Sequence, residues 1–128
     1  MDDLQSALRA RISSAIGHAR VYWGNVPQGT VGSYIRLTTI SDPRPMHLKG
    51  YTTSRETRVQ MDVFAGTYAE ARSISETIIA AVERPATVGA VQLGRTRAEG
   101  PRDLGEDVTG GTYIHRLSTD LLVWHSLA

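Results

Sequence analysis

The chain has 128 residues, enough to bury a core of its own, so we expect a single domain spanning residues 1–128. Its 41% hydrophobic and 21% charged residues are typical of a globular protein rather than a disordered one. The formal net charge of +1 argues against a protein that coats nucleic acid, and the lack of cysteine excludes disulfides, thiolate nucleophiles and cysteine-ligated zinc.

The first expected element is an amphipathic helix over residues 3–16. Its apolar residues recur at spacings of three and four and form one stripe: Leu4, Ala7, Leu8, Ile12, Ala15 and Ile16. Asp2 or Asp3 can cap its start, and Gly17 stands where a left-handed residue would end it. A short strand over residues 21–23 follows, because valine, tyrosine and tryptophan favour extended backbone.

A second strand is expected over residues 33–40, where most side chains are β-branched or aromatic. Residues 41–56 then form a loop or a ragged hairpin, because Pro43 and Pro45 each lack the amide hydrogen that a central strand donates. Within this segment, we expect residues 47–51 to be extended.

The clearest strand covers residues 57–65, where apolar and polar side chains alternate. One face carries Val59, Met61, Val63 and Ala65. The opposite face carries Arg58, Gln60 and Asp62, with Phe64 as an apolar exception. This pattern predicts a sheet that buries one face and leaves the other largely polar.

A second helix is expected from Thr67 to Glu83. Thr67 and Glu70 match a capping box, in which the threonine hydroxyl accepts a hydrogen bond from the Glu70 amide. Pro85 prevents the helix from continuing much further.

Three segments complete the chain: a strand over residues 88–97, a loop over residues 98–111 and a long strand over residues 112–125. The last strand places Leu117, Leu121 and Val123 on one face. The predicted fold class is α+β, with two helices packed on one face of a mainly antiparallel sheet, in the order α-β-β-β-α-β-β. The edges of such a sheet need a cover, which favours oligomerisation.

We find no catalytic, cofactor or metal motif, so we expect no enzyme activity, no catalytic residues, no cofactor and no metal. The histidines are scattered: His18, His47, His115 and His125. Asp103, Glu106 and Asp107 could form a carboxylate cluster for a metal, but glycine and proline surround them and no further ligand is evident. A solvated acidic loop explains them better.

The N-terminus and the charge composition carry further expectations. The start Met1-Asp2-Asp3 lacks the basic region of a signal peptide, and no apolar run reaches the ~18 residues that span a bilayer, so we expect a soluble protein without a membrane partner. Lys49 is the only lysine, and the rest of the positive charge is arginine. This bias suits protein interfaces, but a GC-rich genome also replaces lysine with arginine and is the favoured explanation.

Several segments, in chain order, form a pattern more specific than any single residue. The N-terminal helix is followed by Val21-Tyr22-Trp23-Gly24-Asn25-Val26-Pro27-Gln28-Gly29 and the extended Tyr34-Ile35-Arg36-Leu37. Ser41-Asp42 and a turn at Gly50 precede Thr57-Arg58-Val59-Gln60-Met61-Asp62-Val63-Phe64-Ala65, which leads into Thr67-Tyr68-Ala69-Glu70-Ala71. The chain closes on Asp120-Leu121-Leu122-Val123-Trp124-His125. Over nearly its full length this pattern resembles the tail-completion (tail terminator) family of long-tailed phages and prophages, although Ser33 stands where that family often has a proline.

The resemblance implies a structural virion protein, a subunit of a ring that is typically a hexamer. Such a ring caps the head-proximal end of the tail tube, stops the addition of tail-tube subunits and joins the tube to the head. The implied partners are further copies of the chain, the tail tube protein, the head–tail connector protein, and DNA that passes through the lumen without sequence-specific binding. The implied location is the virion tail, after assembly in the host cytoplasm.

Candidate interface residues lie in or beside the two expected loops, because loops carry binding while a scaffold holds them. The basic group is Arg44, His47, Arg55 and Arg58, and the acidic group is Asp103, Glu106 and Asp107. The two groups could meet across a subunit interface by charge complementarity. The alternative is that both are solvated loops.

Other classes of function stay open. Another head–tail connector or a minor tail protein would share the small size and the lack of catalytic motifs. A small-molecule-binding or enzymatic α+β domain would need a pocket with convergent polar groups. A DNA-binding module would need a basic face, and the balanced charge argues against a strong one.

Overall fold

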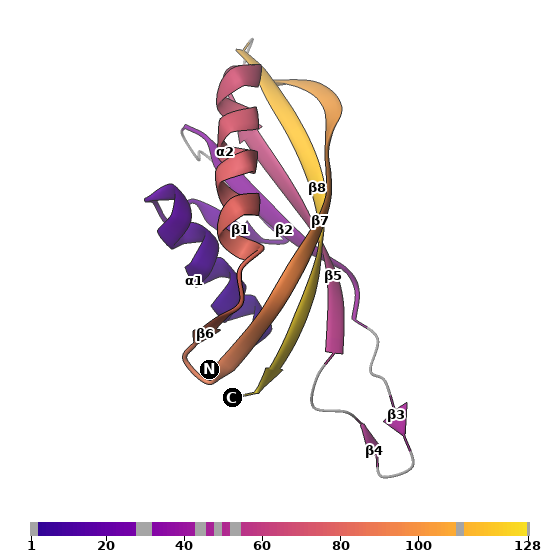
Figure 1. The fold of residues 1–128 in the computed structure, drawn as a ribbon. Coiled ribbons are helices and arrows are strands. Elements are labelled where there is room, and N and C mark those ends of the chain that lie inside the picture. The colour runs from indigo at the N-terminus through magenta and orange to yellow at the C-terminus, as the bar shows by residue number, and fades with distance from the viewer. Residues whose placement is uncertain are drawn as a thin grey trace.

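The computed structural model describes residues 3–27, 32–42, 46–47, 50–51, 55–109 and 112–127. Two helices, a six-stranded sheet and a separate two-stranded hairpin make up this part of the chain (Figure 1). The predicted α+β class is therefore confirmed. No helix among the described residues is long and apolar enough to cross a membrane.

Helix α1 (Leu4–Ile16) begins and ends at the residues that its caps predict. Oδ1 of Asp3 accepts a hydrogen bond from the Ser6 amide at 2.8 Å, and this bond lowers the pKa of the Asp3 carboxyl. Gly17 follows the helix with a left-handed φ of 79° and donates its amide to the Ser13 carbonyl.

Helix α2 (Tyr68–Val82) likewise begins at its predicted cap. The Thr67 hydroxyl accepts a hydrogen bond from the Glu70 amide at 3.1 Å, as the capping box predicts. The helix ends with Glu83 as its C-cap, shortly before Pro85.

The six strands of the sheet lie in the order β1-β2-β5-β8-β7-β6. Their bounds are β1 (Val21–Trp23), β2 (Tyr34–Ser41), β5 (Arg55–Ala65), β6 (Ala86–Val88), β7 (Val91–Thr109) and β8 (Thr112–Leu127). The expected order α-β-β-β-α-β-β needs correction, because β6 is an additional strand. Four of the five strand pairings in this sheet are antiparallel, as expected of a mainly antiparallel sheet, but β1 runs parallel to β2. The sheet is therefore mixed, and the chain must return to the starting end of β1 before β2 begins.

The small hairpin comprises β3 (Met46–His47) and β4 (Gly50–Tyr51), which pair with each other and not with the main sheet. Figure 1 shows it projecting from the end of the sheet. This agrees with the expected ragged hairpin in the segment 41–56.

The predicted loop over residues 98–111 is wrong, because β7 continues through it to Thr109. Three register shifts between β7 and β8 each place one extra residue on β7, which is the signature of a β-bulge. A glycine lies within each shift: Gly94, Gly100 and Gly105. Gly100 and Gly105 have left-handed φ values of 127° and 92°, so the glycines that suggested a loop instead bend a strand.

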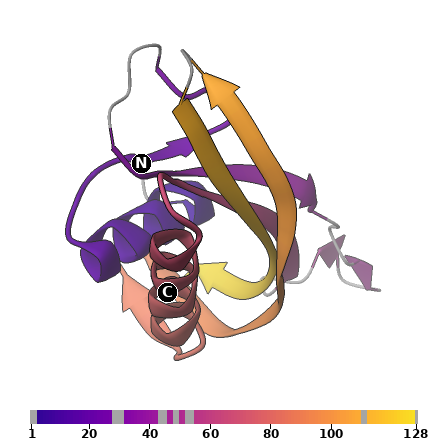
Figure 2. The same cartoon turned by 90° about the horizontal axis from the view of Figure 1, so that it is seen from above.

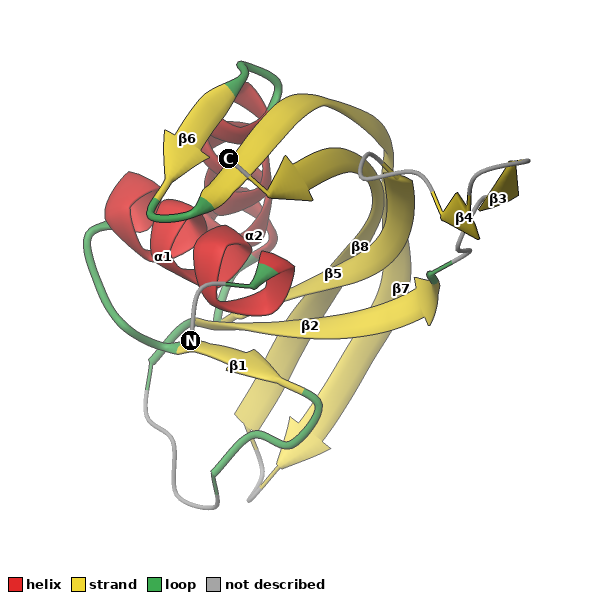
Figure 3. Ribbon diagram, turned by 90° about the horizontal axis from the view of Figure 1, so that it is seen from below, coloured by secondary structure: helices red, strands yellow, loops and turns green. Residues whose placement is uncertain are grey.

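The core lies between the helices and one face of the sheet. Figures 1 and 2 show α1 and α2 on the same side of the sheet, and Figure 3 shows the long strands curving past them. The predicted alternation in β5 and β8 holds, since each strand turns one set of side chains into this core. The core residues include Leu8, Ile12, Ile35, Leu37, Val59, Met61, Val63, Ile78, Val82, Leu117, Leu121 and Val123.

Candidate assembly surface

Of the sequence-predicted interface residues, the structure describes the side chains of Arg55, Arg58 and Asp103, and these three do not form one patch. Arg44 lies outside the described residues, and the side chains of His47, Glu106 and Asp107 are outside them as well, although their strands are described. Arg55 and Arg58 lie on β5, whereas Asp103 lies towards the far end of β7.

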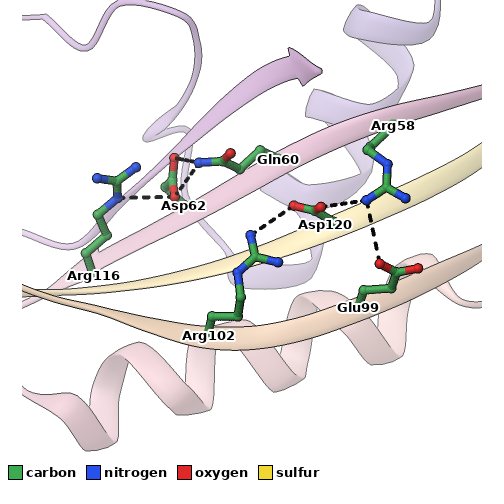
Figure 4. Close-up of polar contacts among 7 residues, drawn as sticks. All are labelled: Arg58, Gln60, Asp62, Glu99, Arg102, Arg116 and Asp120. Atoms are coloured by element: carbon green, nitrogen blue, oxygen red, sulfur yellow. Dashed lines mark hydrogen bonds and ion pairs between the residues drawn. The ribbon is translucent and has the colours of Figure 1, made fainter. Parts of the chain in front are cut away.

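The main polar feature is a ladder of alternating charges on the outer face of the sheet, the face turned away from the two helices. It crosses four neighbouring strands, from β2 through β5 and β8 to β7. We call it the charge ladder, and its members are Arg36, Asp62, Arg116, Arg102, Asp120, Arg58 and Glu99. Figure 4 shows all of them except Arg36, together with Gln60. Sequence reasoning selected only Arg58 from it, although the polar alternation of β5 had predicted a polar face.

Asp62 is the most enclosed member of the charge ladder, with no exposed surface. Its Oδ1 accepts a hydrogen bond from Nε of Arg116 at 3.2 Å, and its Oδ2 accepts one from Nη2 of Arg36 at 3.4 Å. The amide of Gln60 donates to the same carboxylate at 3.1 and 3.2 Å. Hydrogen bonds from side chains on three strands offset the free-energy cost of burying this carboxylate.

Phe64, the predicted apolar exception on this face, explains how the two arginines are held in place. Its ring stacks on Tyr34 with centroids 4.6 Å apart. The guanidinium carbons of Arg36 and Arg116 lie 5.4 and 5.6 Å from the ring centroid, within the range of cation–π attraction. Phe64 is thereby buried on the outer face and orients the cations toward Asp62.

Asp120 forms the second centre of the charge ladder. Its Oδ2 accepts a hydrogen bond from Nη1 of Arg58 at 2.7 Å, and its Oδ1 accepts one from Nη2 of Arg102 at 3.2 Å. Nη1 of Arg58 also lies 3.6 Å from Oε2 of Glu99. The hydrogen bond to Asp120, helped by the charge of Glu99, raises the pKa of Arg58. Arg58 is therefore already paired within its own chain.

A second polar group anchors both ends of the segment that carries the β3–β4 hairpin. Oγ1 of Thr57 donates to Oδ1 of Asp42 at 2.8 Å and lies 2.7 Å from Nε2 of His125. Because the hydroxyl proton goes to the carboxylate, Nε2 of His125 must carry the hydrogen that Thr57 accepts. Nε of Arg55 lies 3.2 Å from Asp42, an ion pair in which the N–H is not directed at the carboxylate. Arg55, like Arg58, is thus engaged within its own chain.

The described charged side chains of this face are paired with one another. In the part of the chain that the structure describes, no group of three or more histidine, aspartate or glutamate residues is placed to hold a metal. Asp103 accepts a hydrogen bond from the Gly105 amide at 2.8 Å and so shapes its own bulge. The arrangement offers paired charges on a rigid sheet, which is a basis for docking against a complementary surface.

Comparison with known proteins is consistent with this description. No curated protein is a significant match to the chain. Two of the solved structures that match the chain illustrate the shared fold. One belongs to an assembly described as the virion of a native gene transfer agent particle, with a TM-score of 0.63, 17% identity and 94% of each chain covered. The other has a TM-score of 0.57 and 14% identity, and the match covers 98% of this chain and 93% of that one. Residues 2–123 match the family described as tail completion protein gp17, and the chain therefore belongs to that family.

Proposed function

We propose that this chain is a structural subunit of a ring that terminates the phage tail tube and joins it to the head connector. The observation that carries the proposal is the family match, which spans residues 2–123 and so includes every element of the main sheet apart from the end of β8. A chain of the same fold within a gene transfer agent virion supports a place in a particle.

The sheet edges support lateral association. β1 pairs with β2 only at residues 35–37, and β6 pairs with β7 only at residues 91–93, so most of each outer edge has no strand beside it among the described residues. Exposed edges of this kind favour contacts with another chain, and heterologous contacts close into a ring when the rotation between subunits allows. We propose a hexamer, by analogy with the family.

The proposed neighbours are the tail tube protein on one side of the ring and the head–tail connector protein on the other. DNA would pass through the lumen without sequence-specific recognition. The ring would sit at the head-proximal end of the tail, after assembly in the host cytoplasm. It would act by shape and charge complementarity, without enzyme activity.

We keep the candidate interface residues as a proposal, but two of them already have partners in their own chain. Arg55 pairs with Asp42, and Arg58 pairs with Asp120. A neighbouring subunit would therefore have to add an acidic group to these ion pairs or replace the present carboxylate. The charge ladder supplies such a surface, because Arg58, Arg102 and Glu99 keep part of their side chains exposed. We place Arg44, His47, Glu106 and Asp107 at the same contacts from the sequence alone.

Mass measurement by light scattering over a concentration series, followed by negative-stain imaging, tests the ring. Discrete rings, either alone or on added tail tubes, support it. A chain that stays monomeric at high concentration and binds no tail tube contradicts it. Arg58→Glu should impair ring contacts while the domain stays folded, and normal tail completion by this variant would exclude Arg58 from the interface.

A further inference from the structure

The C-terminal end of α2 carries an arginine with an incomplete set of partners. Nη2 of Arg11 donates to the carbonyl oxygens of Ala81 and Arg84, which lie where the negative end of the helix dipole is found. Nη1 of Arg11 is buried and has no hydrogen-bond partner within the described part of the chain. Burial lowers the pKa of Arg11, and no described acidic side chain forms an ion pair with it.

This guanidinium borders a groove of about 400 Å³ between α1, the end of α2 and β6. The rest of its lining is mostly small and apolar: Ala10, Ala15, Ala81, Ala86 and Val88. An apolar groove with one fixed, unpaired cation fits a ligand that presents a carboxylate beside an apolar side chain.

The same chain presents such a pair at its third β-bulge. Among the residues whose side chains the structure describes, Leu104 is one of four large apolar residues that are well exposed, with 47% of its surface accessible. Asp103 precedes it and is also exposed. The bulge has a defined shape, because the Gly105 amide donates to Asp103 at 2.8 Å and Gly105 has a φ of 92°. The bulge thus carries an exposed apolar residue beside an exposed carboxylate that is hydrogen-bonded to the Gly105 amide.

The groove and the bulge cannot meet within one chain. β6, beside the groove, pairs with residues 91–93 of β7, and Leu93 lies opposite His125. Asp103 lies opposite Leu117, which is separated from His125 by roughly 25 Å of strand at ~3.3 Å per residue. In Figure 1, β6 lies toward one end of the molecule and the end of β7, where β8 begins, lies at the other. A contact between them is therefore heterologous, the type that closes rings.

We propose that the groove beside Arg11 binds the Asp103–Leu104 bulge of a second copy of this chain. Leu104 occupies the alanine-lined groove, and the Asp103 carboxylate pairs with the Arg11 guanidinium. This contact rests on the proposed ring and assigns its lateral interface. It also gives Asp103, which sequence reasoning had placed at an interface, a definite partner.

Cross-linking between copies tests the contact directly, because the chain contains no cysteine. Ser14, an exposed residue of α1 that lines the groove, is changed to cysteine in one preparation, and Leu104→Cys is made in another. Ile40→Cys is the matched control, since Ile40 is 50% exposed on a bulge of β2. We expect the Leu104→Cys mixture to form disulfide-linked dimers about tenfold faster than the Ile40→Cys mixture, because docking raises the effective concentration. Equal rates overturn the proposal.

Solution variants give a second readout. Asp103→Asn keeps an oxygen for the Gly105 amide but removes the charge, and Ser14→Glu places a carboxylate beside Arg11. Each should weaken self-association by about tenfold, and Asp103→Lys combined with Ser14→Glu should restore most of it. Glu76→Gln on the exposed side of α2 is the neutral control.

The outcomes separate this contact from the ring itself. If rings form and none of these variants weakens them, the contact is wrong while the ring stands. If Ser14→Glu blocks binding to tail tubes but leaves self-association unchanged, the groove faces another protein and the contact is again wrong. If the specific cross-link forms but no ring caps a tail tube, the contact stands and the proposed function fails.

Discussion

Nε of Arg116 on β8 lies 3.2 Å from Oδ1 of Asp62 on β5, and the Asp62 side chain has no exposed surface. Two strands are therefore joined on their outer face by a buried carboxylate as well as by backbone hydrogen bonds. The face of the sheet without helices is consequently not a simple solvated surface. It has a fixed electrostatic pattern that a partner can recognise.

Arg116→Met should destabilise the fold, because it leaves the buried Asp62 with fewer compensating donors. We expect a loss of about 1–3 kcal/mol in the free energy of unfolding, measured by urea titration. Adding Asp62→Leu should recover part of the loss. Arg72→Met, which breaks the exposed Arg72–Glu76 pair, is the control and should cost at most about 0.5 kcal/mol. Equal costs for the two single variants would contradict the role of Asp62.

Thr57→Val should loosen the anchor of the β3–β4 hairpin. The variant keeps the shape of a buried residue but removes the hydroxyl that joins Asp42 to His125. We expect a loss of about 1–3 kcal/mol and faster amide hydrogen exchange in β3 and β4. Thr87→Val, at the exposed position of β6, is the matched control, and a similar effect from both variants would contradict the role of Thr57.

Stability should fall on mild acidification because of His125. Its burial, together with the nearby Arg55 guanidinium, lowers the pKa of His125, although Asp42 acts in the opposite direction. The unfolded chain then binds this proton at higher pH than the folded chain does, so stability is fully present above about pH 6.5 and declines as the pH falls toward the lowered folded pKa.

His125→Gln should reduce this dependence in denaturant titrations between about pH 7 and pH 5. His18→Gln should remove a separate contribution of the same sign, since burial and the charge of Arg20 also lower the pKa of His18. An unchanged pH profile in His125→Gln would contradict the assignment.

Gly100→Ala should be costly because the bulge in β7 requires a glycine. A Cβ at this position would lie 3.0 Å from the carbonyl oxygen of Ser118, at a φ of 127° that other residues rarely adopt. We expect a loss of about 1–3 kcal/mol in thermal or urea unfolding. Gly66→Ala, with open space around the new methyl group, should change stability by at most about 1 kcal/mol. A harmless Gly100→Ala would show that the bulge tolerates other residues.

The sequence predicted correctly those helix ends and strand faces that are determined by residues close together in the chain. The caps at Asp3 and Thr67 and the alternation in β5 act over a few residues, so the sequence is sufficient to place them. β7 was missed beyond residue 97 because Gly100, Pro101 and Gly105 carry the same signal in a loop and in a bulged strand. Only the pairing with β8 distinguishes the two.

The charge ladder escaped prediction for a related reason. Asp62 has the local pattern of an exposed strand residue, and its burial depends on Arg36 and Arg116, which are distant in sequence. The same holds for Arg58, which the sequence suggested as available for a neighbour but which Asp120 already binds. Long-range pairing of this kind is decided by strand order and register, which no local pattern specifies.

The most direct test of the ring is to add the fluorescently labelled chain to phage tail tubes assembled in its absence and to image the tubes by electron and fluorescence microscopy. We predict one ring of the chain at a single end of each tube and no further elongation when tail-tube subunits are supplied. Label distributed along the tubes, or tubes that keep growing at a bound end, would contradict it.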